Sequence, residues 1–281
     1  MTKTKSAIGC ISPAQRRHWD RHGYLLIEQA LSPTDVELLL GRVDSLLASK
    51  ARGDFVSQGS AAAFKIIQAV SQTDVLDSLS DHPVVFPLLL ALLGPWLQIL
   101  GSEIFVRNSG SGREPLVSWH TDGGPTLGAF LPRRGNPVLQ MKAQFFLTDL
   151  RERDSGNFML VPGSHKTTLP PDRIESKEIP DGAIQLLARA GDVLLFPWSL
   201  WHAVAPNHSG RTRRSATFRY GQLWSRPYDY ERLPEEVLAR MTSRRRRLFG
   251  DLGPNADPVS YFYPDEEEHL RLMGVSTSLS S

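Results

Sequence analysis

Between residues 97 and 224 the chain is built of short apolar or alternating segments that are separated by glycine and proline. Segments of this length and spacing are typical of the strands of a β-sandwich or β-barrel. The segments expected to be strands are 97–107, 115–122, 138–147, 157–161, 184–187, 192–197 and 212–224. The sequence therefore predicts a mainly β fold, in which strands position most of the functional side chains.

Helical periodicity dominates the residues before this region. Helices are expected over 13–21, 33–47 and 82–93, with a short strand over 23–27. Ser12 and Ser32 each precede a proline, which is the usual order of an N-cap and a first helical residue. The third run is apolar almost all round and too short to span a bilayer, so it indicates a buried helix.

The C-terminal residues also favour helix. The periodicity predicts one over 233–241, and the four arginines at 244–247 are expected to form a solvated helical face. A chain of 281 residues of which 41% are hydrophobic can bury one large core. We therefore expect a single domain over 1–281, with a helical part at about 12–95, a β core at about 97–224 and a helical extension at about 230–281.

Composition argues against several classes of function. The net charge of +2 gives no strong field, so neither nucleic acid nor an anionic membrane is expected as a partner. Cys10 is the single cysteine, which excludes an internal disulfide framework and fits a reducing compartment. No apolar run is long enough to cross a bilayer, and residues 1–12 lack the apolar core of a signal peptide. We expect a cytoplasmic location and a small-molecule partner, and the sequence leaves the oligomeric state open.

One tripeptide in an expected strand carries metal chemistry. Residues 116–122 alternate, and a strand sends every second side chain to the same face, so His120 and Asp122 can share a metal ion. A second pair with this spacing, His18 and Asp20, falls in an expected helix, where residues two apart point in very different directions. The second pair cannot hold one ion.

Three histidines downstream are candidates for a third ligand: His165, His202 and His208. His202 follows a turn and a short apolar strand at 190–197, which would fix a ligand better than the polar loop around His208. His165 belongs to a turn and is expected to be a surface or turn-stabilising residue. Two imidazoles and one carboxylate are the ligand set of non-haem Fe(II) oxygenases.

Arg213 and Ser215 lie on one face of the strand that opens at residue 212. An arginine with a hydroxyl two residues on can bind a carboxylate through a planar fork and one further donor. The alternative is a solvated basic edge formed with Arg211 and Arg214, and neither of those has an equivalent hydroxyl two places later.

These residues together resemble the phytanoyl-CoA dioxygenase (PhyH) family. The resemblance runs from about residue 15 to about residue 220 and includes the turn at 161–165 and Gly191-Asp192 before the distal histidine. It implies a double-stranded β-helix, also called a jelly roll or cupin-like fold, and dependence on Fe(II), 2-oxoglutarate and O2, and it admits ascorbate as reductant. The roles that it implies are iron ligation by His120, Asp122 and His202, and binding of 2-oxoglutarate by Arg213 assisted by Ser215.

The resemblance implies an Fe(II)- and 2-oxoglutarate-dependent dioxygenase, an oxidoreductase that releases succinate and CO2. Hydroxylation of an aliphatic carbon in a small organic metabolite, in specialised metabolism, is the expected reaction. Desaturation, epoxidation, epimerisation and cyclisation remain open, as do a cupin-like metalloprotein that does not use 2-oxoglutarate and a non-catalytic binding protein. Asp122 disfavours halogenation, because the related halogenases have a small residue there.

Further residues could complete the site. Additional co-substrate contacts are expected from Lys65, Gln140, Lys142 and Gln144, although alternation alone does not decide which face of 138–147 is interior. Substrate contacts are expected from Trp119, Phe130, Arg133 and Trp201. The segments 123–136 and 165–180 are rich in glycine, proline and charge and are expected to form loops near the site.

Overall fold

The computed structural model describes residues 11–49, 57–59, 63–110, 118–124, 138–167, 174–175 and 179–275. The helices are α1 (Pro13–His22), α2 (Pro33–Ser49), α3 (Ala69–Gln72), α4 (Phe86–Leu93), α6 (Glu235–Ala239), α7 (Ser243–Leu248) and α8 (Glu266–Met273), with 3-10 turns at Asp74–Leu79, Ser164–Lys166 and Pro258–Tyr261. The strands are β1 (Leu25–Ile27), β2 (Ser57–Gly59), β3 (Ala63–Ile67), β4 (Leu97–Arg107), β5 (Ser118–Trp119), β6 (Gln140–Phe146), β7 (Phe158–Leu160), β8 (Ile174–Glu175), β9 (Ile184–Gln185), β10 (Val193–Pro197), β11 (His202–Val204) and β12 (Arg213–Gln222).

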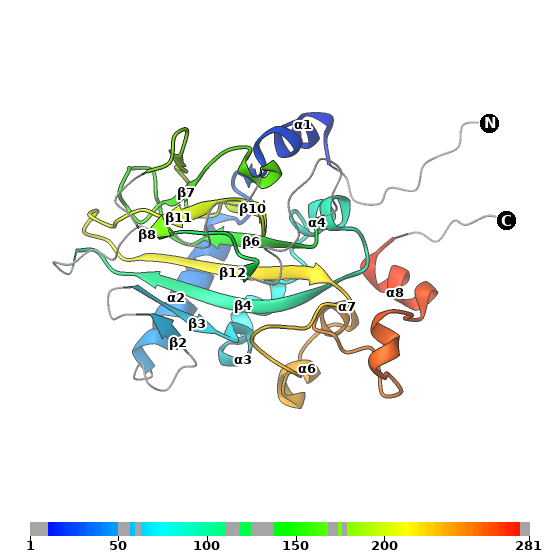
Figure 1. Cartoon of the computed structure of the whole chain (residues 1–281). Coiled ribbons are helices and arrows are strands. Elements are labelled where there is room, and N and C mark those ends of the chain that lie inside the picture. Colours follow the sequence, from blue (N-terminus) through cyan, green and yellow to red (C-terminus); the bar gives the residue numbers. More distant parts are fainter. Residues whose placement is uncertain are drawn as a thin grey trace.

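A large sheet of seven strands is the main element of the fold, and all of its strand pairs are antiparallel (Figure 1). Its order is β1-β10-β6-β12-β4-β3-β2. A three-stranded sheet, β11-β7-β9, and a two-stranded sheet, β5-β8, are joined to each other by an isolated bridge between His120 and His202. The arrangement is the jelly roll that the sequence predicted.

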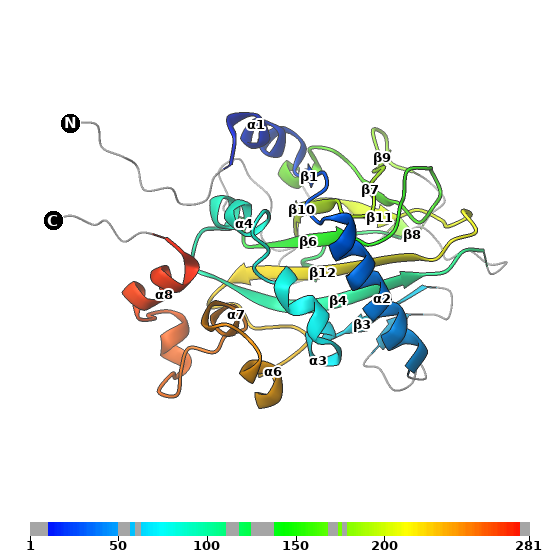
Figure 2. The same cartoon turned by 180° about the vertical axis from the view of Figure 1, so that it is seen from behind.

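The two faces of the large sheet differ in polarity. One face presents apolar side chains such as Ile104, Phe145 and Phe218, which pack in the main core with residues of α2, α3 and α4. Figure 2 shows these helices lying across that face. The opposite face carries polar and charged side chains in its middle strands, of which Glu103 and Thr217 are fully buried. A strand that is apolar on one side and polar but buried on the other indicates a built binding site.

Local sequence signals explain most of the element boundaries. Ser12 accepts a hydrogen bond from the backbone N–H of Gln15, and the Gln15 side chain bonds back to Ser12, which is the capping box that starts α1. The helix expected over 82–93 begins only at Phe86. The physical reason is Pro87, which is tolerated in the first turn of a helix but not in its interior.

The arginine run at 244–247 lies in helix α7 as expected, but the expectation of a solvated face is wrong for Arg247. Arg247 is buried and pairs with Glu268 of α8. Its neighbours also have partners: Arg244 donates to the Leu272 carbonyl, Arg245 pairs with Asp81 and Arg246 pairs with Asp251. The four cations therefore connect the C-terminal extension to itself and to the body of the protein.

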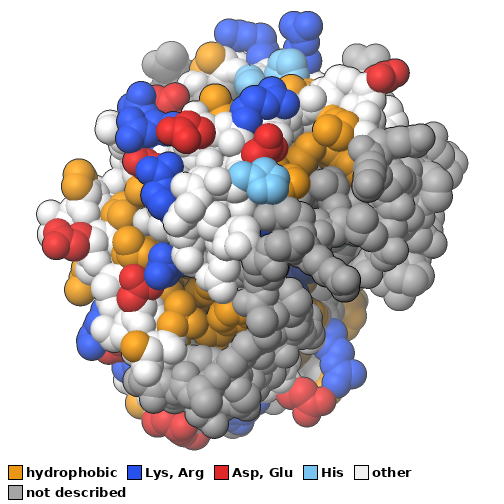
Figure 3. All heavy atoms as spheres, turned by 90° about the vertical axis from the view of Figure 1, so that its left-hand side faces the viewer, with side chains coloured by type: hydrophobic (Ala, Val, Ile, Leu, Met, Phe, Trp, Pro, Cys, Tyr) orange, Lys and Arg blue, Asp and Glu red, His pale blue; other side chains and the backbone are white. Residues whose placement is uncertain are grey.

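On the face shown in Figure 3, basic and acidic side chains are interspersed and hydrophobic side chains lie between them. This mixed pattern agrees with the low net charge of the sequence. Within the described residues, no helix is long and apolar enough to cross a membrane.

Asp229 connects the segment after β12 to two other parts of the fold. Its Oδ2 accepts hydrogen bonds from the backbone N–H groups of Gln68 and Ser102, each at 3.0 Å. Its Oδ1 is buried and has no hydrogen-bond partner. Burial raises the pKa of Asp229 to about 6, against the opposing effect of the two backbone hydrogen bonds.

We expect Asp229→Asn to change how stability depends on pH. The folded protein holds the Asp229 proton more tightly than the unfolded chain, so this contribution to stability is present below about pH 4 and is lost as pH rises to about 6. Relative to wild type, the unfolding free energy of the variant should rise by roughly 2 kcal/mol between pH 4.5 and pH 7. Urea unfolding at both pH values measures this, and an identical pH dependence in the two proteins would contradict it.

Candidate active site

His120 and His202 lie directly opposite each other on neighbouring strands. The His120 N–H donates to the His202 carbonyl at 2.9 Å, and the His202 N–H donates to the His120 carbonyl at 3.0 Å. Paired residues of an antiparallel bridge project their side chains to the same face. The two imidazole rings accordingly lie 4.4 Å apart, centroid to centroid.

Asp122 comes to the same place from a turn, because strand β5 ends at Trp119 and does not extend to residue 122 as the alternation predicted. Its backbone N–H donates to the Trp198 carbonyl at 2.9 Å, which holds the chain against the turn before His202. One ligand atom from each of the three side chains lies within 4.8 Å of the others, a spacing that could hold a metal ion. The structure thus brings together the three residues that the sequence selected as ligands.

The His202 ring is held in one orientation. Its Nδ1 lies 2.8 Å from the Leu200 carbonyl, which makes Nδ1 the protonated nitrogen and leaves the Nε2 lone pair available. Phe158 stacks on the ring, and Phe196 meets it edge-on. Burial, and after it His120, lowers the pKa of His202 to about 3, so the ring is neutral at neutral pH and suited to bind a metal.

The two oxygens of the Asp122 carboxylate have different surroundings. Its Oδ1 accepts from Lys142 Nζ at 2.7 Å and from an Arg219 nitrogen at 3.4 Å. Its Oδ2 is buried, accepts no hydrogen bond and lies 3.8 Å from His202 Nε2. Burial opposes ionisation, yet the pKa of Asp122 is lowered because Lys142, then His202 and Arg219, favour the charged form. A buried carboxylate oxygen beside two imidazoles fits a divalent transition metal.

Arg213 and Ser215 share the inward face of β12 with Thr217 and Arg219. Arg213 is 4% exposed, and its Nε is buried without a hydrogen-bond partner. It lies opposite Arg107 in the strand register. Burial, then Arg107, lowers the pKa of Arg213 to about 9, still well above neutral pH, so the guanidinium remains a cation. A buried cation of this kind favours an anionic ligand.

The side chains expected to contact the co-substrate lie on this inward face or line its opening. Gln144 donates from Nε2 to the Ser215 hydroxyl at 3.3 Å, and Lys142 contacts Asp122. Gln140 lines a cleft that also includes Asp122. Lys65 of β3 lies further along the sheet, where its Nζ donates to Glu103 at 2.5 Å.

The residues expected to contact substrate are placed differently. Trp119 is fully buried in a cluster with Met159 and Ala203, so the structure does not bring it to the metal-binding side chains. Trp201 is half-buried, and its ring lies 5.6 Å from that of Trp119. Phe130 and Arg133 lie outside the described residues, as do parts of both expected loops.

Three side chains of this region were not selected from the sequence: Glu103, Arg219 and Tyr228. The sequence contains only weak signals for these three residues. Glu103 is the single acidic residue of the strand expected over 97–107, and Arg219 continues the alternation of Arg213, Ser215 and Thr217. Tyr228 follows the last strand, where no periodicity predicts its direction.

A jelly roll with two histidines and an aspartate gathered at one end defines a class of mononuclear metal-dependent proteins. The family model for phytanoyl-CoA dioxygenase (PhyH) matches residues 19–215. The chain therefore belongs to the phytanoyl-CoA dioxygenase family, a family of oxidoreductases, as the sequence motifs predicted.

Curated relatives agree with this assignment. Dioxygenase cdmA of Talaromyces verruculosus is 27% identical over 188 residues, which is 66% of this chain and 61% of that protein. The chain thus spans about three fifths of the length of that relative. Ectoine dioxygenase of Bordetella bronchiseptica is 26% identical over 279 residues, covering 86% of this chain and 87% of that protein.

Solved structures share the fold. HygX from Streptomyces hygroscopicus, with nickel, 2-oxoglutarate and hygromycin B bound, superposes with a TM-score of 0.65 at 17% identity, covering 78% of this chain and 90% of that one. The non-heme alpha ketoglutarate dependent epimerase SnoN from nogalamycin biosynthesis has a TM-score of 0.60 at 23% identity, covering 75% and 85%. Both confirm the expected jelly roll.

The ligand assignment predicts that His202→Ala abolishes stoichiometric metal binding, because it removes a neutral, oriented imidazole from the buried cluster. His208→Ala is the matched control, since His208 lies six residues later, outside the cluster. Anaerobic Fe(II) titration of the two apoproteins measures the difference. Tight stoichiometric iron in His202→Ala, or equal loss in both variants, would contradict the assignment.

Proposed function

We propose that this protein is an Fe(II)- and 2-oxoglutarate-dependent dioxygenase that hydroxylates an aliphatic carbon of a small organic metabolite. The observation that carries the proposal is the convergence of His120, Asp122 and His202 at one end of an inward face that also carries the buried Arg213. Family membership and the relatives named dioxygenases support it.

In this proposal His120, Asp122 and His202 hold the iron. When bound, Fe(II) and 2-oxoglutarate supply the activation of O2, and the keto acid is converted to succinate and CO2. Lys142 and Arg219 fix one oxygen of Asp122, so the other oxygen is directed to the metal position. The carboxylate is thereby held as a ligand through a single oxygen.

Arg213 and Ser215 bind the distal carboxylate of 2-oxoglutarate. The Arg213 guanidinium supplies the charge and a planar pair of donors. Gln144 donates to the Ser215 oxygen, so the Ser215 hydroxyl hydrogen is left to donate to the carboxylate. On the other side of the site, Phe158 and Phe196 pack against His202 and exclude water from that wall.

The same set of residues suits several oxidative outcomes. Hydroxylation is proposed because the metal ligands are complete, and Asp122 occupies the position that a halogenase would leave open. The structural relatives include an epimerase and a carbocyclase, so epimerisation and cyclisation are the alternative outcomes. Ascorbate is proposed as a reductant that keeps the iron in its Fe(II) form.

We also propose that residues 1–281 form one domain. The main hydrophobic core supports this, because it includes Leu39 of α2, Phe218 of β12 and Leu248 of α7. Helices from both ends of the chain thus share a core with the large sheet. The cytoplasm stays the predicted location.

The co-substrate assignment predicts that Arg213→Ala weakens 2-oxoglutarate binding by about a hundredfold, because a buried charge-assisted pair is lost. Arg214→Ala is the matched control: Arg214 is the next residue of the same strand and pairs with Asp44 instead. Anaerobic addition of Fe(II) and then 2-oxoglutarate should give a weak visible metal-to-ligand charge-transfer band in wild type and Arg214→Ala. In Arg213→Ala the band should need far more 2-oxoglutarate.

Two results would count against the proposal. Iron binding without the band in wild type would favour a cupin-like metalloprotein that does not use 2-oxoglutarate. Absence of iron binding would favour a binding protein without catalysis.

A further inference from the structure

Glu103 is a buried carboxylate that the proposed reaction does not use. It lies on the inward face of β4 and is 1% exposed. Its Oε1 accepts from Lys65 Nζ at 2.5 Å and from the Tyr228 hydroxyl. Burial disfavours its charged form, yet Lys142, Lys65 and Arg219 lower the pKa of Glu103, so it is ionised at neutral pH.

The other oxygen of this carboxylate has no partner. Glu103 Oε2 is buried and accepts no hydrogen bond. Thr217 pairs with Glu103 in the strand register, and its hydroxyl is also buried without a partner. Side chains paired in this way have Cβ atoms about 4.5–5.5 Å apart. Leaving an ionised oxygen unsatisfied costs more than leaving a neutral group unsatisfied, so this position calls for a hydrogen-bond donor.

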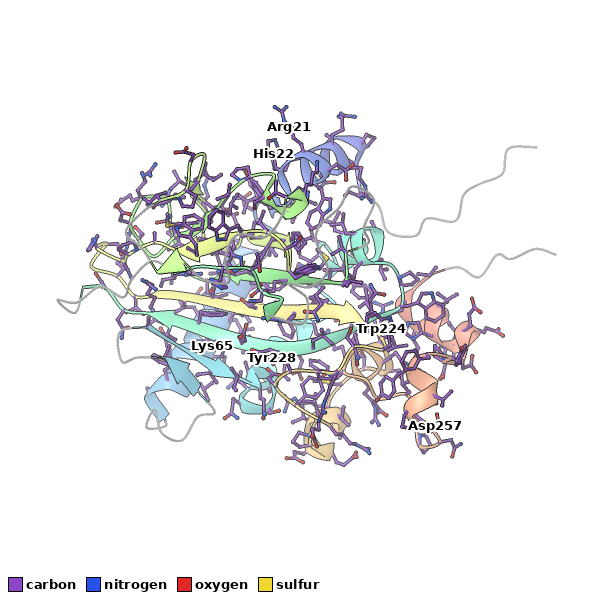
Figure 4. The ribbon with its side chains drawn as sticks, viewed as in Figure 1. Arg21, His22, Lys65, Trp224, Tyr228 and Asp257 are labelled. Carbon is purple, nitrogen blue, oxygen red and sulfur yellow. The ribbon has the colours of Figure 1, made fainter. Side chains whose placement is uncertain are left out.

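A cleft of about 350 Å³ lies beside this region, and it shares Tyr228 with the surroundings of Glu103. It is lined by Asp122, Arg219, Tyr228, Trp224, Leu100 and Leu139, among others. Tyr228 links the cleft to Glu103, because its ring forms part of the wall and its hydroxyl contacts the carboxylate. Figure 4 labels Tyr228 and Trp224, from the segment that follows β12, together with Lys65 of β3. The rings of Trp224 and Tyr228 are partly exposed and offer flat apolar surface.

We propose that Glu103 and Thr217 form a substrate subsite that takes a neutral hydroxyl group, while the cleft beside Tyr228 and Trp224 takes the ring framework that carries it. This inference rests on the proposed function and adds a substrate class to it. The substrate is an uncharged cyclic alcohol whose reacting carbon lies on the Asp122 side of the cleft.

Hydrogen-bonding chemistry and local charge together favour a hydroxyl over other groups. Glu103 Oε2 can only accept, whereas the Thr217 hydroxyl can also donate. A substrate hydroxyl can donate to Glu103 and accept from Thr217 at once. A carboxylate cannot donate to Glu103, and this also excludes 2-oxoglutarate as the missing partner. An ammonium group could donate to both oxygens, but it would add a fourth cation near Lys65, Lys142 and Arg219.

The test compares four probes with one ring system: 2-naphthylmethanol, 2-naphthylmethylamine, 2-naphthoate and 2-methylnaphthalene. Binding is measured by ligand-observed NMR to the full chain loaded with Zn(II) and 2-oxoglutarate, which does not turn over. The alcohol should bind at least tenfold more tightly than each of the other three, as a hydrogen bond to a charged group provides. Glu103→Gln should abolish this preference, and Thr217→Val should reduce it about threefold.

A control variant distinguishes loss of this subsite from a general destabilisation of the protein. Glu152→Gln changes an exposed acid in the same way and should keep the preference. If Glu103→Gln does not fold, the preference for the alcohol is tested with Thr217→Val alone.

Equal affinity for the four probes, or an unchanged preference in Glu103→Gln or Thr217→Val, would overturn the subsite. The same samples report 2-oxoglutarate binding independently. Wild-type protein that binds 2-oxoglutarate but shows no alcohol preference refutes the subsite alone. Wild-type protein that does not bind 2-oxoglutarate refutes the proposed function.

Discussion

The antiparallel bridge between His120 and His202 is the contact on which the rest of the site depends. It is a single pair of backbone hydrogen bonds that joins two small sheets. Because paired residues project to the same face, the bridge sets the spacing of the two imidazoles. Asp122 joins them from the turn that follows His120, where its backbone N–H donates to the Trp198 carbonyl. A shift of one residue in this register would turn one imidazole away from the other. The geometry of the two imidazoles is therefore a property of strand pairing.

The large sheet also carries charged side chains that are buried in the folded protein. Its outward face packs on helices, whereas its inward face places Lys142 and Arg219 against Asp122, and Lys65 against Glu103. Buried charges are costly unless they are paired, and these pairs satisfy one oxygen of each carboxylate. The remaining oxygens and the Arg213 Nε have no hydrogen-bond partner, and in our proposals they bind a metal, an alcohol and a co-substrate. The inward face thus presents three positions that differ in charge and in hydrogen-bonding capacity.

Sequence reasoning predicted the fold class and selected the three side chains that the structure brings together, because it used local periodicity. The expected strand over 97–107 coincides with β4, and His202 was preferred because a turn and an apolar strand precede it. Strand β11, which carries His202, and strand β3, which carries Lys65, were not predicted. They have three and five residues, too few to show a period, and they form only through pairing with β7 and β4.

The sequence by itself determined which residue types are available and which side chains share a strand face, since alternation is a local property. It therefore specified the pair Arg213 and Ser215, whereas Asp122 reaches His120 through a turn. Only the tertiary structure decided the partners across strands: Glu103 beside Thr217, and Lys142 at Asp122. Register between strands far apart in the chain is set by the packing of the whole core, and no local segment carries that information.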